Sequence, residues 1–310
     1  MYRLYLKGKH KTWIELPPEL RPSWRKTKFV KPVVLLIKAL YGHPDAGGLW
    51  EAHLKRVLRN LGGAEVIEFP GNFYFSESKL LLSTYVDDLT LAGPVARHQP
   101  FWEKLTSLVD VEPPEPFYRV LGRNHSIVDL PWQQVAADGA TSSNDSISIP
   151  NKPVSHMIFD MYDYGLQTVE LYKSITGIDK VKPAATPFVP EGSILEQDEG
   201  PRGELAAHAC NILMKALWLG RLARPDIVKP INDLATKVQN WSRAEDTKLL
   251  RLIEYISATP HYRLAGSIND KEEDLELQLY VDGDFAGDKE NARSTSGGFL
   301  VLVVPHHSFL

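Results

Sequence analysis

The chain has 310 residues but only one cysteine, Cys210. A single thiol excludes an intramolecular disulfide, so the fold is not a small disulfide-stabilised secreted scaffold. No apolar run approaches the length that crosses a bilayer, and the first residues, MYRLYLKGKHK, lack the apolar segment of a signal peptide. These absences predict a soluble intracellular protein without membrane partners, and leave open whether it works in the cytoplasm or the nucleus.

The chain also has little net charge, −4, which argues against a general nucleic-acid-binding protein. The average conceals an asymmetry, because residues 1–38 contain ten Lys and Arg against two acids, whereas residues 270–290 contain nine acids against two lysines. The basic segment is interleaved with Trp13, Trp24 and Phe29, a composition that can follow a phosphate backbone. A solvated charged surface is the simpler interpretation of the same residues.

Hydrophobic residues make up 43% of the sequence, enough for a packed core. Periodicity predicts the following segments: helices over 48–62, 94–110 and 156–176, a mostly helical region over 203–258 with a break at 223–227, a buried strand or helix over 30–42, strands over 72–93 and 275–305, and a loop over 131–153. This order of elements predicts an α+β fold.

Two adjacent acids, Asp87 and Asp88, interrupt the apolar run LLLSTYVDDLTLAG at residues 80–93. Carboxylates beside a packed sheet are costly to bury unless a cation or a donor meets them. At the tip of a hairpin they can bind hard divalent cations, and two such ions held about 4 Å apart support phosphoryl transfer. Because neighbouring strand residues point to opposite faces, we expect Asp87 to be the main ligand and Asp88 the weaker partner. A plain acidic surface turn is the alternative.

A second acidic cluster lies in YVDGDFAGDKE, residues 280–290. Asp282 and Asp284 fit positions 1 and 3 of a calcium-binding EF-hand loop, but Ala286 and Arg293 stand at positions 5 and 12, where oxygen ligands are required. An EF-hand is therefore excluded. An acidic hairpin turn without a metal is the simplest interpretation of these residues.

The chain resembles the Pol polyprotein of Ty1/copia-type LTR retrotransposons over almost its whole length. YVDD (85–88) resembles the active-site hairpin of the reverse transcriptase, and YVDGDFAGDKENARSTSGGFLVL (280–302) resembles the opening strands of the ribonuclease H domain. Further segments resemble the family in the same order: WIELPPEL (13–20), LYGHPDAGGLWEAHL (40–54), VLGRNHSI (120–127), VKPAATP (181–187) and RLARPDI (221–227).

The resemblance implies a reverse-transcriptase palm and fingers carrying the YVDD hairpin, a following helical region and an incomplete ribonuclease H-like α/β unit. The boundaries we expect are fingers and palm over 1–130, a loop and thumb-like segment over 131–195, a helical connection over 196–265 and the start of ribonuclease H over 266–310.

The resemblance further implies an RNA-directed DNA polymerase that uses two Mg²⁺ ions, deoxynucleoside triphosphates and an RNA or DNA primer–template. Asp87 and Asp88 would be catalytic metal ligands, and Asp282 the first metal-binding carboxylate of ribonuclease H. Tyr85, Lys38, Arg25 and Lys26 would contact nucleic acid, and Tyr41 and Gly42 would belong to the nucleotide pocket.

The chain also departs from the family. The family's third polymerase carboxylate would precede Met1, and the later ribonuclease H acids and the integrase segment are missing from this sequence. We therefore expect the chain alone to be inactive as a polymerase, which leaves its status as an enzyme open. A non-catalytic nucleic-acid-binding remnant of a retroelement is the alternative function. A metal-dependent nuclease that works through Asp282 alone is a weaker third possibility.

Overall fold

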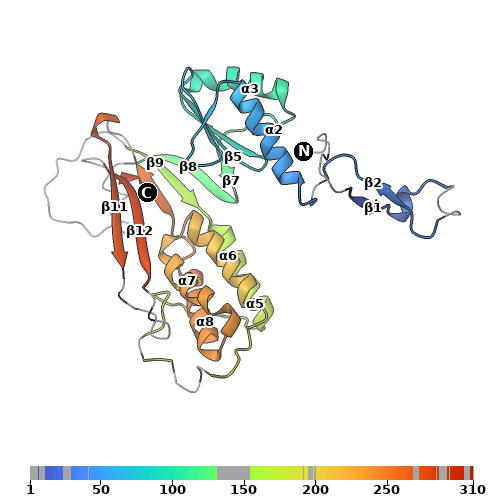
Figure 1. Ribbon diagram of the computed structural model, residues 1–310. Helices are drawn as coiled ribbons and strands as arrows, with labels where there is room; N and C mark the ends of the chain where they lie inside the picture. The colour runs from blue at the N-terminus through green and yellow to red at the C-terminus, as the bar shows by residue number, and fades with distance from the viewer. Residues whose placement is uncertain are drawn as a thin grey trace. The chain divides into compact units, whose positions relative to one another are not determined.

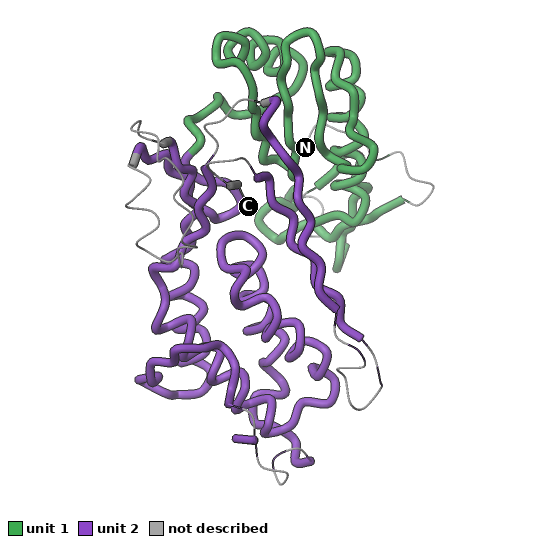
Figure 2. The backbone as a smooth tube through the Cα atoms, turned by 90° about the vertical axis from the view of Figure 1, so that its left-hand side faces the viewer, with its two compact units in different colours: residues 1–117 green, residues 118–310 purple. Residues whose placement is uncertain are grey.

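A computed structural model describes the following residues: 6, 11–23, 29–40, 42–130, 154–190, 192–194, 198, 200–267, 272–283, 285, 292, 294–303 and 308–309. The chain divides into two compact units, Met1–Phe117 and Tyr118–Leu310, which Figure 2 shows in different colours. Each unit mixes helices with antiparallel strands (Figure 1), so the α+β expectation is confirmed at that level. No helix in the described part of the chain is both long and apolar enough to cross a membrane.

The first unit is organised around a four-stranded antiparallel sheet in the order β3-β4-β5-β6. Its strands are β3 (Ala64–Glu65), β4 (Asn72–Phe75), β5 (Leu80–Tyr85) and β6 (Asp88–Ala92). Leu80 and Leu82 of β5 are buried while Leu81 between them is exposed, so one face of the sheet is covered. The cover consists of helices α2 (Ala46–Asn60) and α3 (His98–Leu108), the latter preceded by the short 3₁₀ helix η2 (Val95–Arg97).

A small hairpin precedes this sheet. It pairs β1 (Trp13–Glu15) with β2 (Val33–Leu35), and the 3₁₀ helix η1 (Pro18–Leu20) lies in the connection. The strand predicted within residues 30–42 is therefore present, but its predicted burial is wrong, because Val33 and Leu35 are both exposed. A two-stranded hairpin has no second layer to bury its apolar side chains.

The second unit contains a four-stranded antiparallel sheet in the order β10-β9-β8-β7. Its strands are β7 (Arg119–Val120), β8 (Arg123–Leu130), β9 (Val154–Asp160) and β10 (Leu264–Ser267). The predicted helix over 156–176 begins later, because residues 154–160 pair with β8 and α5 runs from Tyr162 to Thr176. The carboxylate of Asp160 accepts the backbone N–H of Tyr162 at 2.7 Å and so stabilises the first turn of α5.

The helical part of this unit contains α6 (Ala209–Leu222), η4 (Pro225–Ile227), α7 (Val228–Thr236), η5 (Val238–Asn240) and α8 (Arg243–Ala258), which confirms the break at 223–227. Arg224 in that break is only 3% exposed and binds the Asp226 carboxylate through two nitrogens. It also donates to the Thr259 carbonyl at 2.8 Å, and the Tyr255 hydroxyl donates to Asp226 at 2.9 Å. This paired buried charge joins the corner between α6 and α7 to the C-terminal end of α8.

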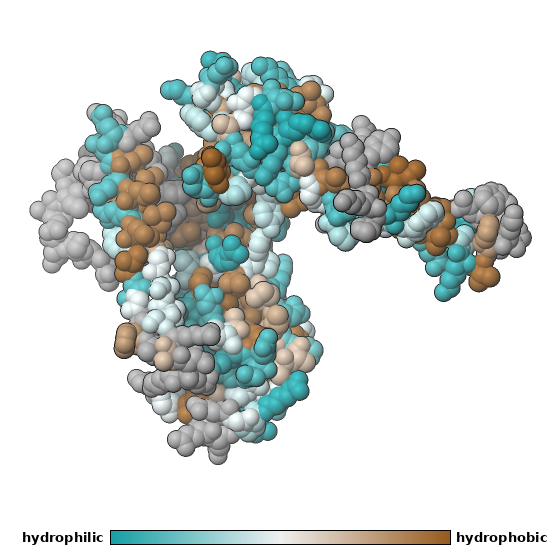
Figure 3. All heavy atoms as spheres, in the orientation of Figure 1, coloured by the Kyte–Doolittle hydropathy of each residue, from teal (hydrophilic) through white to brown (hydrophobic). Residues whose placement is uncertain are grey.

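The last strands are β11 (Glu276–Gly283), β12 (Ser296–Val303) and β13 (Ser308–Phe309), with η6 (Glu272–Asp274) before them. The predicted hairpin is present, with Asp282 paired opposite Gly297. Many of its apolar side chains are poorly covered, and Figure 3 shows hydrophobic residues gathered on the β11–β12 hairpin; the exposed ones are Leu277, Leu279, Tyr280, Val281, Phe299 and Leu300. Such a surface favours association.

Strand β8 carries a buried histidine, His125. Its Nε2 accepts the Nε–H of Arg123 at 3.0 Å, and its ring meets the Phe159 ring edge-on. A nitrogen that accepts a hydrogen bond is not protonated, so the imidazole is neutral. Burial lowers the pKa of His125 to about 4, and the positive charge of Arg123 adds to the effect.

This histidine predicts a pH dependence of stability. An imidazole in the unfolded chain titrates near 6.5, so between that pH and about 4 the unfolded state binds more protons than the folded state. The free energy of unfolding should therefore fall as pH falls through this window, by at most about 1.4 kcal/mol per pH unit. Urea unfolding at several pH values should show a shallower dependence for His125→Gln, which keeps an acceptor but does not titrate. An identical dependence in the variant would contradict the prediction.

Candidate functional site

The hairpin formed by β5 and β6 ends in a two-residue turn. The strands pair from Leu81 opposite Ala92 to Tyr85 opposite Asp88, which leaves Val86 and Asp87 as the loop. Val86 has a φ of +55°, whereas Asp87 is not among the described residues with positive φ. A positive φ at the first loop position alone is the type II′ combination, whose twist suits a hairpin.

Valine is an unusual residue at that position. Its β-branched side chain clashes with the backbone in the left-handed region, at a cost on the order of 1–3 kcal/mol. Such a conformation persists only where the surroundings hold it. Directly before the turn, Thr84 donates its N–H and its hydroxyl to the Gly71 carbonyl at 2.8 and 2.9 Å, which ties β5 to the loop before β4.

Asp87 and Asp88 are both exposed, so a cation can approach them from solvent. Asp87 lies within the turn and Asp88 is the first residue of β6. Two adjacent exposed carboxylates are the donor chemistry of Mg²⁺, which commonly uses one or two protein carboxylates and completes its shell with water and substrate phosphates. Across the described ranges, no group of three or more His, Cys, Asp and Glu side chains gathers as a metal site. The pair therefore fits part of a Mg²⁺ shell rather than a complete protein cage.

The structure brings together three of the predicted site residues, Tyr85, Asp87 and Asp88. The Tyr85 ring is exposed at the end of β5, next to both acids. Lys38 is exposed between β2 and α2.

Of the remaining predicted residues, Gly42 has a φ of +88°, a conformation that favours glycine. Asp282 is exposed on β11 and belongs to the second unit. Arg25, Lys26 and Tyr41 lie outside the described residues, as do Asp284 and the loop at 131–153.

Sequence reasoning missed Trp50. Its place among the apolar residues at helical spacing in 48–62 indicates a core residue, and it is only 7% exposed. Its indole Nε1–H also donates to the carbonyl oxygen of Val86 at 2.6 Å, which joins α2 to the turn that carries Asp87. A buried indole needs an acceptor for its N–H, and that rule was the available signal; the identity of the acceptor was not in the sequence.

Among curated proteins, one described as "Retrovirus-related Pol polyprotein from transposon RE1", from Arabidopsis thaliana, is 24% identical to this chain over 286 residues. The match covers 89% of the chain. The protein is related to retrotransposon Pol polyproteins. It spans only 16% of the length of that relative. No family model matches the chain, and no solved structure matches it significantly.

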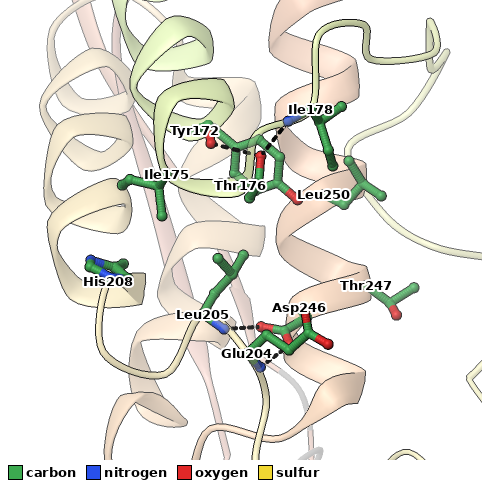
Figure 4. A pocket seen from close by; sticks show the side chains of 10 residues that line it. All are labelled: Tyr172, Ile175, Thr176, Ile178, Glu204, Leu205, His208, Asp246, Thr247 and Leu250. Carbon is green, nitrogen blue, oxygen red and sulfur yellow. Dashed lines mark hydrogen bonds between the residues drawn. The ribbon is translucent and has the colours of Figure 1, made fainter.

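The second unit of this Pol-related chain contains a pocket of about 610 Å³ between α5, the segment before α6 and α8 (Figure 4). The Asp246 carboxylate in its lining accepts hydrogen bonds from the backbone N–H groups of Glu204 and Leu205 and from the indole N–H of Trp241. Burial raises the pKa of the pocket residue Tyr172 to about 12, and the charges of Asp246 and Glu254 add to the rise. Asp246 is thus engaged in tying the segment before α6 to α8, and Tyr172 stays protonated at neutral pH.

The tie between Gly71 and Thr84 predicts a specific sensitivity. Gly71 has a φ of +85°, and a Cβ added there would lie 3.0 Å from the Thr84 carbonyl oxygen. Gly71→Ala should lower the free energy of unfolding by about 1–3 kcal/mol, measured by chemical denaturation. Gly62→Ala is the matched control, because Gly62 has a φ of +92° with nothing within 4 Å of the added Cβ. Equal losses in the two variants would show that the close approach to β5 contributes nothing.

Proposed function

We propose that this Pol-related chain is the reverse transcriptase region of a copia-type retrotransposon, followed by the start of ribonuclease H, and that Asp87 and Asp88 hold Mg²⁺ for nucleotidyl transfer. The observation that carries the proposal is the tight turn that presents two adjacent exposed carboxylates at the tip of a packed hairpin. The curated Pol polyprotein that matches most of the chain supports it.

Each residue of the turn has a role in this proposal. The strained loop sets Asp87 at the tip, and the pairing of Tyr85 with Asp88 fixes the second carboxylate at the start of β6. The Tyr85 ring, which is exposed beside them, supports the primer end or the template base. When bound, Mg²⁺ lowers the pKa of an attacking hydroxyl and neutralises the charge of the triphosphate.

The rigidity of the hairpin also matters for this role. Catalytic carboxylates must be held in one geometry before the substrates arrive, because reorganisation during the reaction reduces the stabilisation they provide. Leu80 and Leu82 are fully buried on the covered face of β5, and Thr84 is tied to Gly71. The two acids therefore lie at the end of a hairpin whose strand β5 is fixed by packing and by hydrogen bonds.

Metal binding at Asp87 is the first test. We expect Mn²⁺, used as a paramagnetic substitute for Mg²⁺, to bind the purified chain and to enhance water proton relaxation. Asp87→Asn removes a charged ligand. Substitutions of residues that merely support a metal ligand typically weaken metal affinity by roughly ten-fold or more, so we expect at least that loss here. Glu77→Gln is the matched control, since Glu77 is an exposed acid in the turn at the opposite end of β5.

Primer extension on RNA and DNA templates supplies the second readout. Mg²⁺-dependent incorporation that Asp87→Asn abolishes and Glu77→Gln preserves would establish the activity. Mn²⁺ affinity that Asp87→Asn leaves unchanged would refute the metal role. Salt-dependent binding of a primer–template that survives Asp87→Asn, without any metal binding, would favour a non-catalytic nucleic-acid-binding protein.

A further inference from the structure

We infer that Trp50 is a positioning residue for the metal-binding turn: its indole N–H holds the Val86 carbonyl and thereby fixes the direction of the Asp87 carboxylate. The role of the carboxylate rests on the proposed function, whereas the contact itself is independent of it. The contact joins residues 36 positions apart, at an Nε1–O distance of 2.6 Å.

The carbonyl that Trp50 binds belongs to the peptide group whose orientation determines the type of the turn. It is the peptide between Val86 and Asp87, at the centre of the two-residue loop. Rotation of this central peptide interconverts the two hairpin turn types, and in type I′ the second loop residue also takes a positive φ. The backbone nitrogen of Asp87 is part of the same peptide. Its rotation therefore re-aims the Cα–Cβ bond of Asp87 and the carboxylate beyond it.

The turn needs such a restraint because its sequence does not favour the observed conformation. Type II′ turns prefer glycine at the first loop position, where this chain has valine with a φ of +55°. Trp50 is well placed to supply the restraint, since α2 packs against the sheet through Leu54, Val57 and Leu58. A rigid helix thus presents a single donor to the one carbonyl whose direction distinguishes the two turns. A typical hydrogen bond shifts such an equilibrium about five-fold.

The turn can be observed directly by selective isotope labelling. The sequence contains four Val–Asp pairs, at 86–87, 109–110, 128–129 and 281–282. Protein labelled with ¹³C at the valine carbonyl and ¹⁵N at aspartate gives one carbonyl–nitrogen correlation for each pair. Asp87→Asn removes the 86–87 signal and so assigns it, while the other three signals serve as internal controls.

We expect Trp50→Phe, which keeps an aromatic ring but removes the N–H, to move the 86–87 signal. We also expect it to weaken Mn²⁺ binding about five-fold. Trp102→Phe is the matched control, because Trp102 packs against the same core from α3, where its ring contacts Phe101. It should leave both the 86–87 signal and the Mn²⁺ affinity unchanged.

A second substitution separates positioning from packing. Glycine adopts the positive φ at the first loop position without strain, so it reduces the need for a restraint. The double variant Trp50→Phe, Val86→Gly should therefore regain most of the Mn²⁺ affinity that Trp50→Phe loses. If Trp50 acted only by filling the core, Val86→Gly would not restore binding.

The outcomes are distinct. An 86–87 signal that does not move in folded Trp50→Phe overturns the inference, and so does unchanged Mn²⁺ affinity where Asp87→Asn weakens it. If Asp87→Asn leaves Mn²⁺ affinity unchanged, the proposed function fails. Movement of the 86–87 signal in Trp50→Phe then tests only whether Trp50 fixes the turn. If Trp50→Phe does not fold, the solvent exchange rate of the indole N–H in the unmodified protein tests whether Trp50 is held in this hydrogen bond. Exchange at Trp50 must be slower than at the exposed Trp13, and equal rates overturn the inference.

Discussion

The candidate site in the first unit depends on one constraint, a valine held at positive φ in a two-residue turn. This conformation is unfavourable for an isolated valine, so it exists only because the surrounding structure determines it. Leu82 anchors β5 in the core, Thr84 is tied to Gly71, and Trp50 holds the Val86 carbonyl. The helices and the sheet together thus keep a strained loop in place, and the two carboxylates lie on that loop and directly after it.

The second unit is stabilised in a different way. Its helices meet around a large apolar core, and the polar groups of the Ala223–Ile227 segment are satisfied by a buried network around Arg224. Removing one member of such a network would leave a buried charge without its partner, which is far more costly than the loss of a surface ion pair. The residues of RLARPDI thus stabilise the packing of the second unit, whereas the two acids of YVDD are exposed to solvent. The Asp226 carboxylate binds Arg224 and the Tyr255 hydroxyl, whereas Asp87 and Asp88 face solvent at the end of their hairpin.

Local patterns in the sequence predicted the elements well where the local preference of a segment matched its burial and pairing in the fold. The hairpin at residues 80–93 and the helices that became α2, α3 and α8 were predicted, because their periodicity reflects one buried face. The burial expected for residues 30–42 was wrong, since burial depends on a second layer that β2 lacks. The helix expected from residue 156 began at Tyr162, because pairing with β8 converted the first residues into a strand. Non-local pairing overrode local preference in that segment.

The sequence by itself determined that two adjacent acids interrupt an apolar hairpin, and hence that Asp87 and Asp88 stand at its tip. It also determined that the buried indole of Trp50 must find an acceptor. Only the tertiary structure decided that this acceptor is the carbonyl of Val86, and that Val86 rather than Asp87 takes the positive φ. The physical reason is that a hydrogen bond requires two groups to meet within about 3 Å. For residues 36 positions apart, that distance is set by how α2 packs on the sheet and not by any local pattern.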